Sequence, residues 1–364
     1  MKRKIITIIG ARPQFIKTPL ISSELNKFAT EILVHTGQHY DDKMSAIFFR
    51  QLGIKKPKYN LAVGSGDQGE QTAKMLEGIE KILLKEKPDL VLIYGDTNST
   101  LAGALAGAKL HIPVAHVEAG LRSYNREMPE EINRIVADHT STLLFCPTRS
   151  SVRTLKGEGI SKGVHWTGDV MADIQRQLIA NSLQQTAKTL KSYGLKPKEY
   201  ILATVHRQEN TDKKENLVNI VEAMVQIGQM IVWPMHPRTQ KALKDYGLDK
   251  KLAQNPSIRL IDPVGFLECM SLETNAKLIL TDSGGVQKEA YLARVPCIIL
   301  RKNTEWVETV ESGWNQLAGT DIKKIVKLAK SFPSASWRME NHPNFLGDGR
   351  AYLKIVKIIE KFLK

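Results

Sequence analysis

Cysteine is scarce in this chain of 364 residues, which contains only Cys146, Cys269 and Cys297. An odd count without metal-ligand spacing excludes a disulfide framework and a zinc site built from cysteines. Cys146 and Cys297 lie inside apolar segments. We therefore expect buried thiols in a reducing compartment, the cytoplasm.

Long hydrophobic runs are also absent. No apolar stretch approaches the ~20 residues that a membrane-spanning helix requires, so we expect no membrane insertion. The basic start Met1–Lys4 resembles the beginning of a signal peptide, but the apolar segment Ile5–Ile9 behind it is short. We interpret that segment as a first β-strand.

Positive charge is in excess, since 52 basic and 38 acidic residues give a net charge of +14. The excess is spread evenly: residues 1–168 carry 23 basic and 17 acidic side chains, and the remainder carry 29 and 21. No basic helix or interleaved aromatic strip occurs, so the charge indicates a lysine-rich surface and is poor evidence for nucleic-acid binding. Its other use is to attract a small polyanion such as a nucleotide.

Short β-branched segments alternate with helix-like segments along the chain. The expected strands are Ile5–Ile9, Glu31–His35, Leu90–Tyr94, Val114–Val117, Leu143–Phe145, Ile201–Thr204, Ile231–Pro234, Ile258–Ile261, Leu278–Leu280 and Cys297–Leu300. Several are continuous apolar strings, as in parallel strands covered on both faces. The alternation predicts an α/β protein made of right-handed βαβ units.

The alternation occurs twice and breaks around Gly168–Asp173. We therefore expect two Rossmann-like domains that face each other across a cleft. The first spans residues 1–168 and is completed by a C-terminal helix within 350–364, and the second spans 169–349. Ligands of such sheets bind at the carboxyl ends of strands, so the residues that follow each strand are candidates for function.

The first strand is followed by Gly10–Lys17, in which Arg12 and Lys17 flank the expected helix start. This pattern suits a diphosphate, although an ordinary turn with surface cations would look the same. The chain has neither a Gly-x-Gly-x-x-Gly fingerprint nor a P-loop.

Three carboxylates follow later strands of the first half. Asp96 is a helix N-cap or a catalytic acid, and Glu118 ends an apolar strand. Glu130 and Glu131 follow Pro129 at an expected helix start, where they either complement the helix dipole or join a site. Three carboxylates at one edge of a sheet would raise one another's proton affinity, as in sites built for proton transfer.

In the second half, His206 and His236 each follow a strand, either as structural histidines or as acid/base groups. The most specific pattern is Thr281–Glu289. Its Ser-Gly-Gly turn would present N–H groups to an anion at a helix start, and its glutamate lies one turn later, within reach of a ribose. An ordinary helix start is the alternative.

Six motifs in order resemble the non-hydrolysing UDP-N-acetylglucosamine 2-epimerase family, over nearly the whole chain. They are Gly10–Lys17, Gly95–Thr97, His116–Gly120, Pro129–Arg134, His206–Glu209 and Thr281–Glu289. The resemblance implies a glycosyltransferase-B-like fold whose C-terminal helix packs back on the first domain, a homodimer, and no requirement for NAD or a metal. It also implies an isomerase that inverts C2 by eliminating UDP, which leaves a 2-acetamidoglucal, and then adding UDP back.

The resemblance assigns acid/base chemistry to Asp96, Glu118 and Glu130, and leaves open which of them removes the C2 proton. His206 would support the leaving diphosphate or transfer a proton. The residues implied to bind substrate are Arg12, Lys17, Arg134, His236, Arg238, Ser283, Gly284, Gly285 and Glu289.

Some motifs depart from the best-known members. Ala11 and Gln14 stand within a motif that usually reads Gly-Thr-Arg-Pro-Glu, and Thr304–Glu308 replaces a usual Thr-Glu-Arg-Pro-Glu. The loop Gln38–Asp42 differs from the version associated with allosteric activation, and its Asp41 would repel a second nucleotide.

These departures, together with Asp262–Phe266, resemble the subgroup that acts on UDP-2,3-diacetamido-2,3-dideoxyglucuronate. Its mannuronate product enters bacterial surface polysaccharides such as lipopolysaccharide O-antigen. We expect that substrate, with UDP-GlcNAc as the alternative. A glycosyltransferase on the same fold, a hydrolysing epimerase and a basic nucleic-acid-binding protein are the competing hypotheses.

Overall fold

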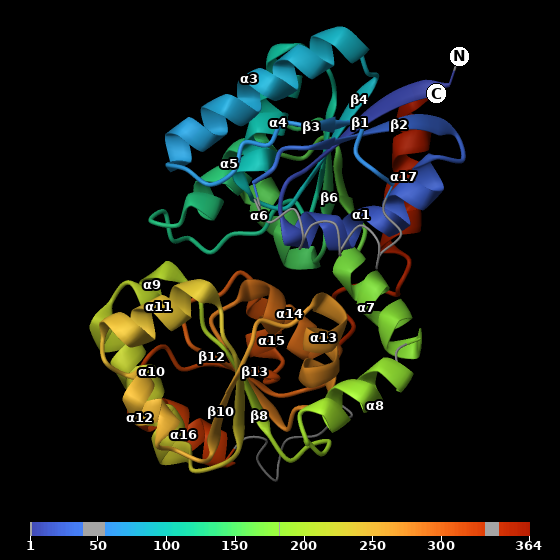
Figure 1. Cartoon of the computed structure of the whole chain (residues 1–364). Coiled ribbons are helices and arrows are strands. Elements are labelled where there is room, and N and C mark those ends of the chain that lie inside the picture. The colour runs from blue at the N-terminus through green and yellow to red at the C-terminus, as the bar shows by residue number, and fades with distance from the viewer. Residues whose placement is uncertain (1, 39–54, 182, 332–341) are drawn as a thin grey trace. The chain divides into compact units, whose positions relative to one another are not determined.

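The computed structural model describes residues 2–38, 55–181, 183–331 and 342–364. The chain divides into two compact units. Unit 1 comprises Met1–Gln177 and Asn344–Lys364, and unit 2 comprises Leu178–Pro343. Each unit contains a parallel sheet with helices on its faces (Figure 1).

The described strands of unit 1 lie in the order β3-β2-β1-β4-β5-β6-β7, and all neighbours are parallel. They are β1 (Arg3–Ile9), β2 (Ala29–His35), β3 (Tyr59–Asn60), β4 (Leu90–Tyr94), β5 (Val114–Val117), β6 (Leu143–Cys146) and β7 (Val164–Trp166). The five strands expected in this half all form. The chain order reverses between β1 and β4, so the carboxyl ends of these two strands mark the switch point at which such sheets bind ligands.

Helices cover both faces of this sheet. They are α1 (Arg12–Leu25), α3 (Gln68–Glu86), α4 (Asn98–Lys109), α5 (Pro129–Thr140), α6 (Arg149–Gly157) and α17 (Ala351–Leu363). Helix α7 (Val170–Asn181) carries the chain from unit 1 into unit 2. Helix α4 packs between α3 and α5, and the C-terminal helix α17 packs against α1 (Figure 1). The alternation along β1 explains the two layers, because Ile6 and Ile8 share a core cluster with Met75 of α3, whereas Ile5 and Ile9 point to the opposite face.

Unit 2 repeats this plan with the strand order β10-β9-β8-β11-β12-β13 among its described residues, again all parallel. The strands are β8 (Ile201–Thr204), β9 (Ile231–Pro234), β10 (Ile258–Ile261), β11 (Leu278–Thr281), β12 (Cys297–Ile299) and β13 (Asn315–Leu317). Its switch point lies between β8 and β11. The sheet core contains Trp233, which is fully buried.

The helices of unit 2 connect these strands. They are α8 (Leu183–Ser192), α9 (Gln208–Thr211), α10 (Lys214–Ile227), α11 (Pro237–Asp245), α12 (Asp249–Ala253), α13 (Phe266–Asn275), α14 (Gly284–Leu292), α15 (Val307–Glu311) and α16 (Ile322–Ser331). Across the described ranges of both units, no helix is long and apolar enough to span a membrane.

The chain leaves unit 1 after residue 177 and returns at residue 344, whereas the sequence pattern indicated changes at 168/169 and 349/350. Hydrogen bonds explain why the intervening residues belong to unit 1. The Asp169 N–H donates to the Leu346 carbonyl (2.8 Å), and Arg176 donates to the Gly347 carbonyl (3.1 Å). The segment that leaves unit 1 and the segment that returns to it are thereby joined.

Candidate active site

Unit 1 places three predicted motifs at neighbouring strand ends. Gly10–Lys17 follows β1, Asp96 follows β4, and Glu118 follows β5 directly. Because β1, β4 and β5 are adjacent in the sheet, their carboxyl ends meet along one edge. The contacts of these residues show what that edge can do.

Glu118 contacts the ammonium group of Lys17, and both side chains are largely buried, with 13% and 5% of their surface exposed. The backbone of Glu118 has φ = +76°, a conformation that costs a side-chain-bearing residue about 1 kcal/mol or more. The N–H groups of Glu118 and Ala119 both donate to the Phe145 carbonyl at 3.1 Å, which holds this backbone in place. The result is a carboxylate with a cation against it at the strand end.

Asp96 makes an ion pair with the guanidinium group of Arg134 on α5. The same guanidinium group binds Glu131 (Nη1–Oε2, 2.5 Å), and Asn133 donates to the Asp96 carbonyl at 3.0 Å. Arg134 is 4% exposed, whereas 37% of the Asp96 side chain remains accessible. Asp96 is therefore fixed by α5 and still open to a ligand.

The two adjacent glutamates of α5 have different surroundings. Glu131 is buried and accepts hydrogen bonds from the N–H and hydroxyl of Ser123 and from the Tyr124 N–H, each at 2.9 Å. Burial alone would raise the Glu131 pKa, but the Ser123 hydrogen bonds and the Arg134 charge outweigh it and lower the pKa. Glu130 is half-buried and precedes Arg134 by four residues, so the two share one face of α5.

The structure thus brings Lys17, Glu118, Asp96 and Arg134 to the same edge. A Cβ placed on Gly95 would stand 3.4 Å from Glu118 Oε2 and 3.8 Å from Lys17 Nζ, which shows how closely the Asp96 turn approaches the other pair. At this edge Asp96 and Glu118 each lie against a cation.

Gln14 joins the ends of β1 and β4. Its carbonyl oxygen accepts from the N–H groups of Gly10 (2.7 Å) and Ala11 (3.0 Å), and its amide nitrogen donates to the Tyr94 carbonyl (2.9 Å). The same nitrogen lies 3.0 Å from the Thr97 hydroxyl. An ionised glutamate here could accept from the two N–H groups but could not donate to the Tyr94 carbonyl, so the glutamine has a structural role.

Two sequence predictions concern residues that the structure describes partly or not at all. Arg12 begins α1, where Pro13 occupies the first turn, but its side chain lies outside the described part of the structure. Within Gln38–Asp42 only Gln38 is described, and its side-chain oxygen accepts from the Ser99 hydroxyl (2.6 Å). Asp41 lies outside the described residues.

In unit 2, Ser283 is the N-cap of α14, and its hydroxyl accepts from the Val286 N–H at 3.5 Å. A Cβ on Gly284 would stand 1.9 Å from Glu305 Oε1, so a side chain there would displace that carboxylate. At Gly285 the nearest atom would be Ser283 Oγ at 3.7 Å, so that backbone is open to a ligand. A helix start with an uncovered glycine is an arrangement suited to phosphate.

The two histidines of unit 2 lie together, with ring centroids 5.3 Å apart. His236 Nδ1 accepts from the Arg238 N–H (3.2 Å) as the N-cap of α11, and burial, followed by the charges of His206 and Arg238, lowers its pKa. His236 is therefore neutral near pH 7. Arg238 is exposed and pairs with Asp212 at 3.1 Å.

Asp282 holds the His206 loop in place, which the sequence did not indicate. Its carboxylate accepts from the N–H groups of His206 (3.1 Å) and Arg207 (3.0 Å) and from the Asn210 amide (3.0 Å). Its position directly after β11, within the Thr281–Glu289 motif, is the sequence signal that could have indicated it. Glu289 lies on α14, half-buried, one turn beyond the Ser-Gly-Gly start.

Residues 304–308 lie beside the start of α14. Glu305 packs against Gly284 and pairs with Arg301 (3.1 Å), whose guanidinium group also lies 3.2 Å from Glu209. Trp306 is buried, and the ammonium group of Lys288 lies 4.4 Å from its ring centroid. Arg301 directly follows the expected strand Cys297–Leu300, so the strand-end rule could have found it.

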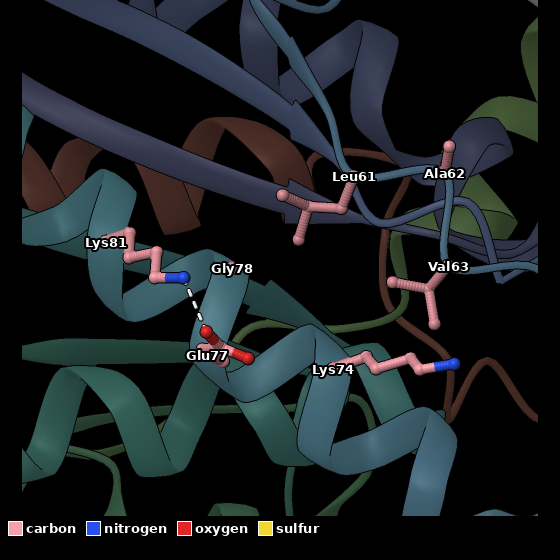
Figure 2. Close-up of a pocket in the computed structure, with 7 residues that line it drawn as sticks. All are labelled: Leu61, Ala62, Val63, Lys74, Glu77, Gly78 and Lys81. Carbon is pink, nitrogen blue, oxygen red and sulfur yellow. Dashed lines mark hydrogen bonds and ion pairs between the residues drawn. The ribbon is translucent and has the colours of Figure 1, made fainter.

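A separate hollow of about 310 Å³ lies beside α3 in unit 1 (Figure 2). It is lined by residues 61–63 and by α3, where Lys81 pairs with Glu77 (2.5 Å) and Lys74 pairs with Glu70. These pairs are solvent-exposed and contribute little energy, and none of the predicted site residues lines the hollow. No group of three or more histidine, cysteine or acidic side chains in the described ranges could hold a metal ion.

Comparisons with known proteins match the chain over almost its full length. The family model described as UDP-N-acetylglucosamine 2-epimerase matches residues 23–360. A Methanococcus maripaludis protein named UDP-N-acetylglucosamine 2-epimerase homolog is 54% identical, with 98% of this chain and 99% of that protein covered. The UDP-2,3-diacetamido-2,3-dideoxy-D-glucuronate 2-epimerase of Pseudomonas aeruginosa is 47% identical, with 98% and 99% covered.

A solved structure also resembles the chain over almost its full length. The Methanocaldococcus jannaschii UDP-GlcNAc 2-epimerase, crystallised with UDP-GlcNAc and UDP, is 47% identical and superimposes with a TM-score of 0.91. The similarity covers 99% of this chain and all of that one. The expected glycosyltransferase-B-like arrangement of two parallel α/β sheets is confirmed.

Proposed function

The chain belongs to the non-hydrolysing UDP-N-acetylglucosamine 2-epimerase family, and we propose on that basis that it inverts C2 of a UDP-2-acetamido sugar by eliminating UDP and adding it back. Family members are isomerases, so the chain is a UDP-sugar 2-epimerase and not a glycosyltransferase. The observation that carries the proposed chemistry is the pair of carboxylates, Asp96 and Glu118, that lie at one sheet edge of unit 1, each against a cation.

The reaction needs a base because the C2 proton is not acidic. A carboxylate of unit 1 takes this proton, the C–H electrons form a C1=C2 double bond, and UDP leaves with the electrons of the C1–O bond. A proton then returns to C2 on the other face while UDP adds to C1. Asp96, Glu118 and Glu130 are the proposed acid/base groups, and Lys17, Arg12 and Arg134 are proposed to stabilise the negative charge that develops.

Unit 2 is proposed to bind the UDP portion. The start of α14, with Ser283, Gly284 and Gly285, offers backbone N–H groups to phosphate, and Glu289 is proposed to bind the ribose. His206 is proposed to support the leaving diphosphate or to transfer a proton. His236 and Arg238 are proposed to lie beside the nucleotide, His236 as a neutral donor through Nε2.

We propose UDP-2,3-diacetamido-2,3-dideoxyglucuronate as the preferred substrate, converted to the mannuronate epimer for surface polysaccharide such as O-antigen. Gln14, Trp306 and the segment Asp262–Phe266 support this choice. UDP-GlcNAc is the second candidate, since the M. jannaschii enzyme is as similar to the chain as the P. aeruginosa enzyme is. We also propose a homodimer in the cytoplasm, where the free thiols Cys146 and Cys297 would stay reduced.

A substrate panel followed by proton NMR tests this proposal. The purified chain is incubated with UDP-GlcNAc and, separately, with its 2,3-diacetamido uronate counterpart. We expect turnover of the uronate at a kcat/KM at least about tenfold higher, a difference of about 1.4 kcal/mol. The product should remain a UDP-sugar. Faster turnover of UDP-GlcNAc would reverse the substrate assignment, and release of a free sugar would contradict a non-hydrolysing enzyme.

A further inference from the structure

His116 on β5 is fully buried and contacts the Asp138 carboxylate and the Gly95 carbonyl, neither of which has a role in the proposed mechanism. Its Nδ1 lies 2.8 Å from Asp138 Oδ1 on α5, and its Nε2 lies 2.7 Å from the carbonyl oxygen of Gly95. A carbonyl oxygen can only accept a hydrogen bond, so Nε2 carries a proton. Gly95 is the residue immediately before Asp96.

Asp138 is ionised in this cluster. Burial would raise its pKa, but the hydrogen bond from His116 and the charges of His116 and Arg122 lower it overall. Asp138 Oδ1 and the Gly95 carbonyl thus contact the two nitrogens of the ring, which fixes the orientation of His116.

Arg122 and Glu158 extend this buried cluster. Arg122 donates to Asp138 Oδ2 (2.6 Å) and makes two hydrogen bonds to Glu158 (2.8 and 2.7 Å). Arg122 thus lies between two carboxylates and compensates the charge of the buried Asp138. The Cys146 thiol also lies in the field of Asp138, and burial followed by that charge raises its pKa to about 12, so it stays neutral.

The cluster holds the backbone at both candidate carboxylates. The Gly95 carbonyl belongs to the peptide plane that contains the Asp96 nitrogen, so the hydrogen bond from His116 fixes the direction in which Asp96 leaves the strand end. Asp138 Oδ2 also accepts from the Gly120 N–H (3.1 Å), two residues beyond Glu118. One buried cluster therefore fixes the backbone beside Asp96 and beside Glu118.

We infer that His116 is a positioning residue for the epimerase reaction: through the hydrogen bond from Nε2 to the Gly95 carbonyl it holds the Gly95–Asp96 peptide in the orientation that Asp96 needs. The inference rests on the proposed function, because it assigns Asp96 to the chemistry. His116 would touch no substrate, so its loss should lower kcat and leave the affinity for UDP almost unchanged.

Two substitutions separate the two contacts of His116. In His116→Gln the amide nitrogen can take the place of Nε2 and donate to Gly95, whereas in His116→Asn the shorter amide reaches only Asp138. We expect the Gln variant to keep kcat within about fivefold and the Asn variant to lose about 10²-fold, the scale of a misplaced catalytic group. Both should bind UDP as the unsubstituted chain does. Equal activity of the two variants, whether both high or both low, would overturn the inference.

The hydrogen bond to Gly95 is tested without any activity. In the full chain labelled with ¹⁵N-histidine, the His116 signals are identified by their absence from the spectrum of the folded Gln variant, among the nine histidines. We expect a proton on Nε2 that exchanges slowly with solvent, because this nitrogen donates to a buried carbonyl. An Nε2 without a proton would overturn the inference. An unsubstituted chain that epimerises no UDP-sugar would refute the proposed function and leave this measurement valid.

Discussion

At the scale of single residues, the proposed chemistry requires a carboxylate that is withdrawn from water and yet ionised. Lys17 beside Glu118 and Arg134 beside Asp96 provide the compensating charge. Asp96 keeps over a third of its side-chain surface accessible, which leaves room for a reacting sugar.

Replacement of Asp96 by asparagine should lower kcat about 10²-fold or more, because the amide cannot take a proton. Asp89, at the opposite end of the same strand, is a matched control. Asp89 precedes β4 at its amino end and pairs with Arg3 (2.9 Å), just as Asp96 follows β4 and pairs with Arg134. Steady-state kinetics of Asp89→Asn should show almost unchanged turnover. Near-normal kcat in Asp96→Asn would remove this residue from the mechanism.

The strand-end rule found the residues of the edge, but it could not find their partners. Asp138 and Asp282 act through contacts with residues 22 and 76 positions away, and no local pattern reports such distances. Gln14 shows the same limit. From sequence it is a departure from the family motif, and only the folded chain shows that its amide joins β1 to β4.

At the scale of elements, apolar strings predicted the central strands well because parallel strands covered on both faces need them. The strands that were missed, β3, β7 and β13, are two or three residues long and lie at the edges of their sheets. An edge strand has one neighbour and partly open faces, as the exposed Trp166 of β7 shows, so it carries no continuous apolar signal.

The start of α14 allows a sharp test of its packing. Gly284→Ala should lower the free energy of unfolding by about 1–3 kcal/mol, because the new methyl group displaces Glu305, which is held by Arg301. Gly285→Ala is the control, since its methyl group meets only ordinary contacts and alanine favours a helix. Thermal melts without nucleotide compare the two. Equal melting temperatures would contradict this packing of Glu305.

At the scale of the whole molecule, the chain enters unit 2 once and returns once, and the returning segment is tied back into unit 1. Asp173 of α7 accepts from the Tyr352 N–H (2.9 Å) at the start of α17, which has no side-chain cap of its own. The sequence predicted that the last helix completes the first unit. It placed the boundaries nine and six residues away, because the contacts that join residues 169–177 to 344–349 carry no local pattern.

Asp173 gives this junction a pH dependence. Burial raises its pKa to about 6 from an ordinary 3.8, so between these values the folded chain holds a proton that the unfolded chain has released. The stability that this proton contributes is largest below pH 4 and is lost as the pH rises through 6. Between pH 5 and pH 7 the loss is about 1 kcal/mol.

Urea unfolding at pH 5 and pH 7 measures this loss in the unsubstituted chain and in Asp173→Asn, which should lack it. Asp348 is the control: it is exposed beside Lys354, whose hydrogen bond lowers its pKa, so Asp348→Asn should keep the dependence between pH 5 and 7. An unchanged pH dependence in Asp173→Asn would contradict the assignment.

The central claim is that C2 is deprotonated and reprotonated on the enzyme. Turnover of the UDP-2-acetamido sugar in D₂O, followed by proton NMR and mass spectrometry of the product, tests it most directly. The account predicts one solvent deuterium at C2 of every epimer formed. Product that accumulates with its original C2 proton would contradict the elimination of UDP and the acid/base roles of Asp96, Glu118 and Glu130.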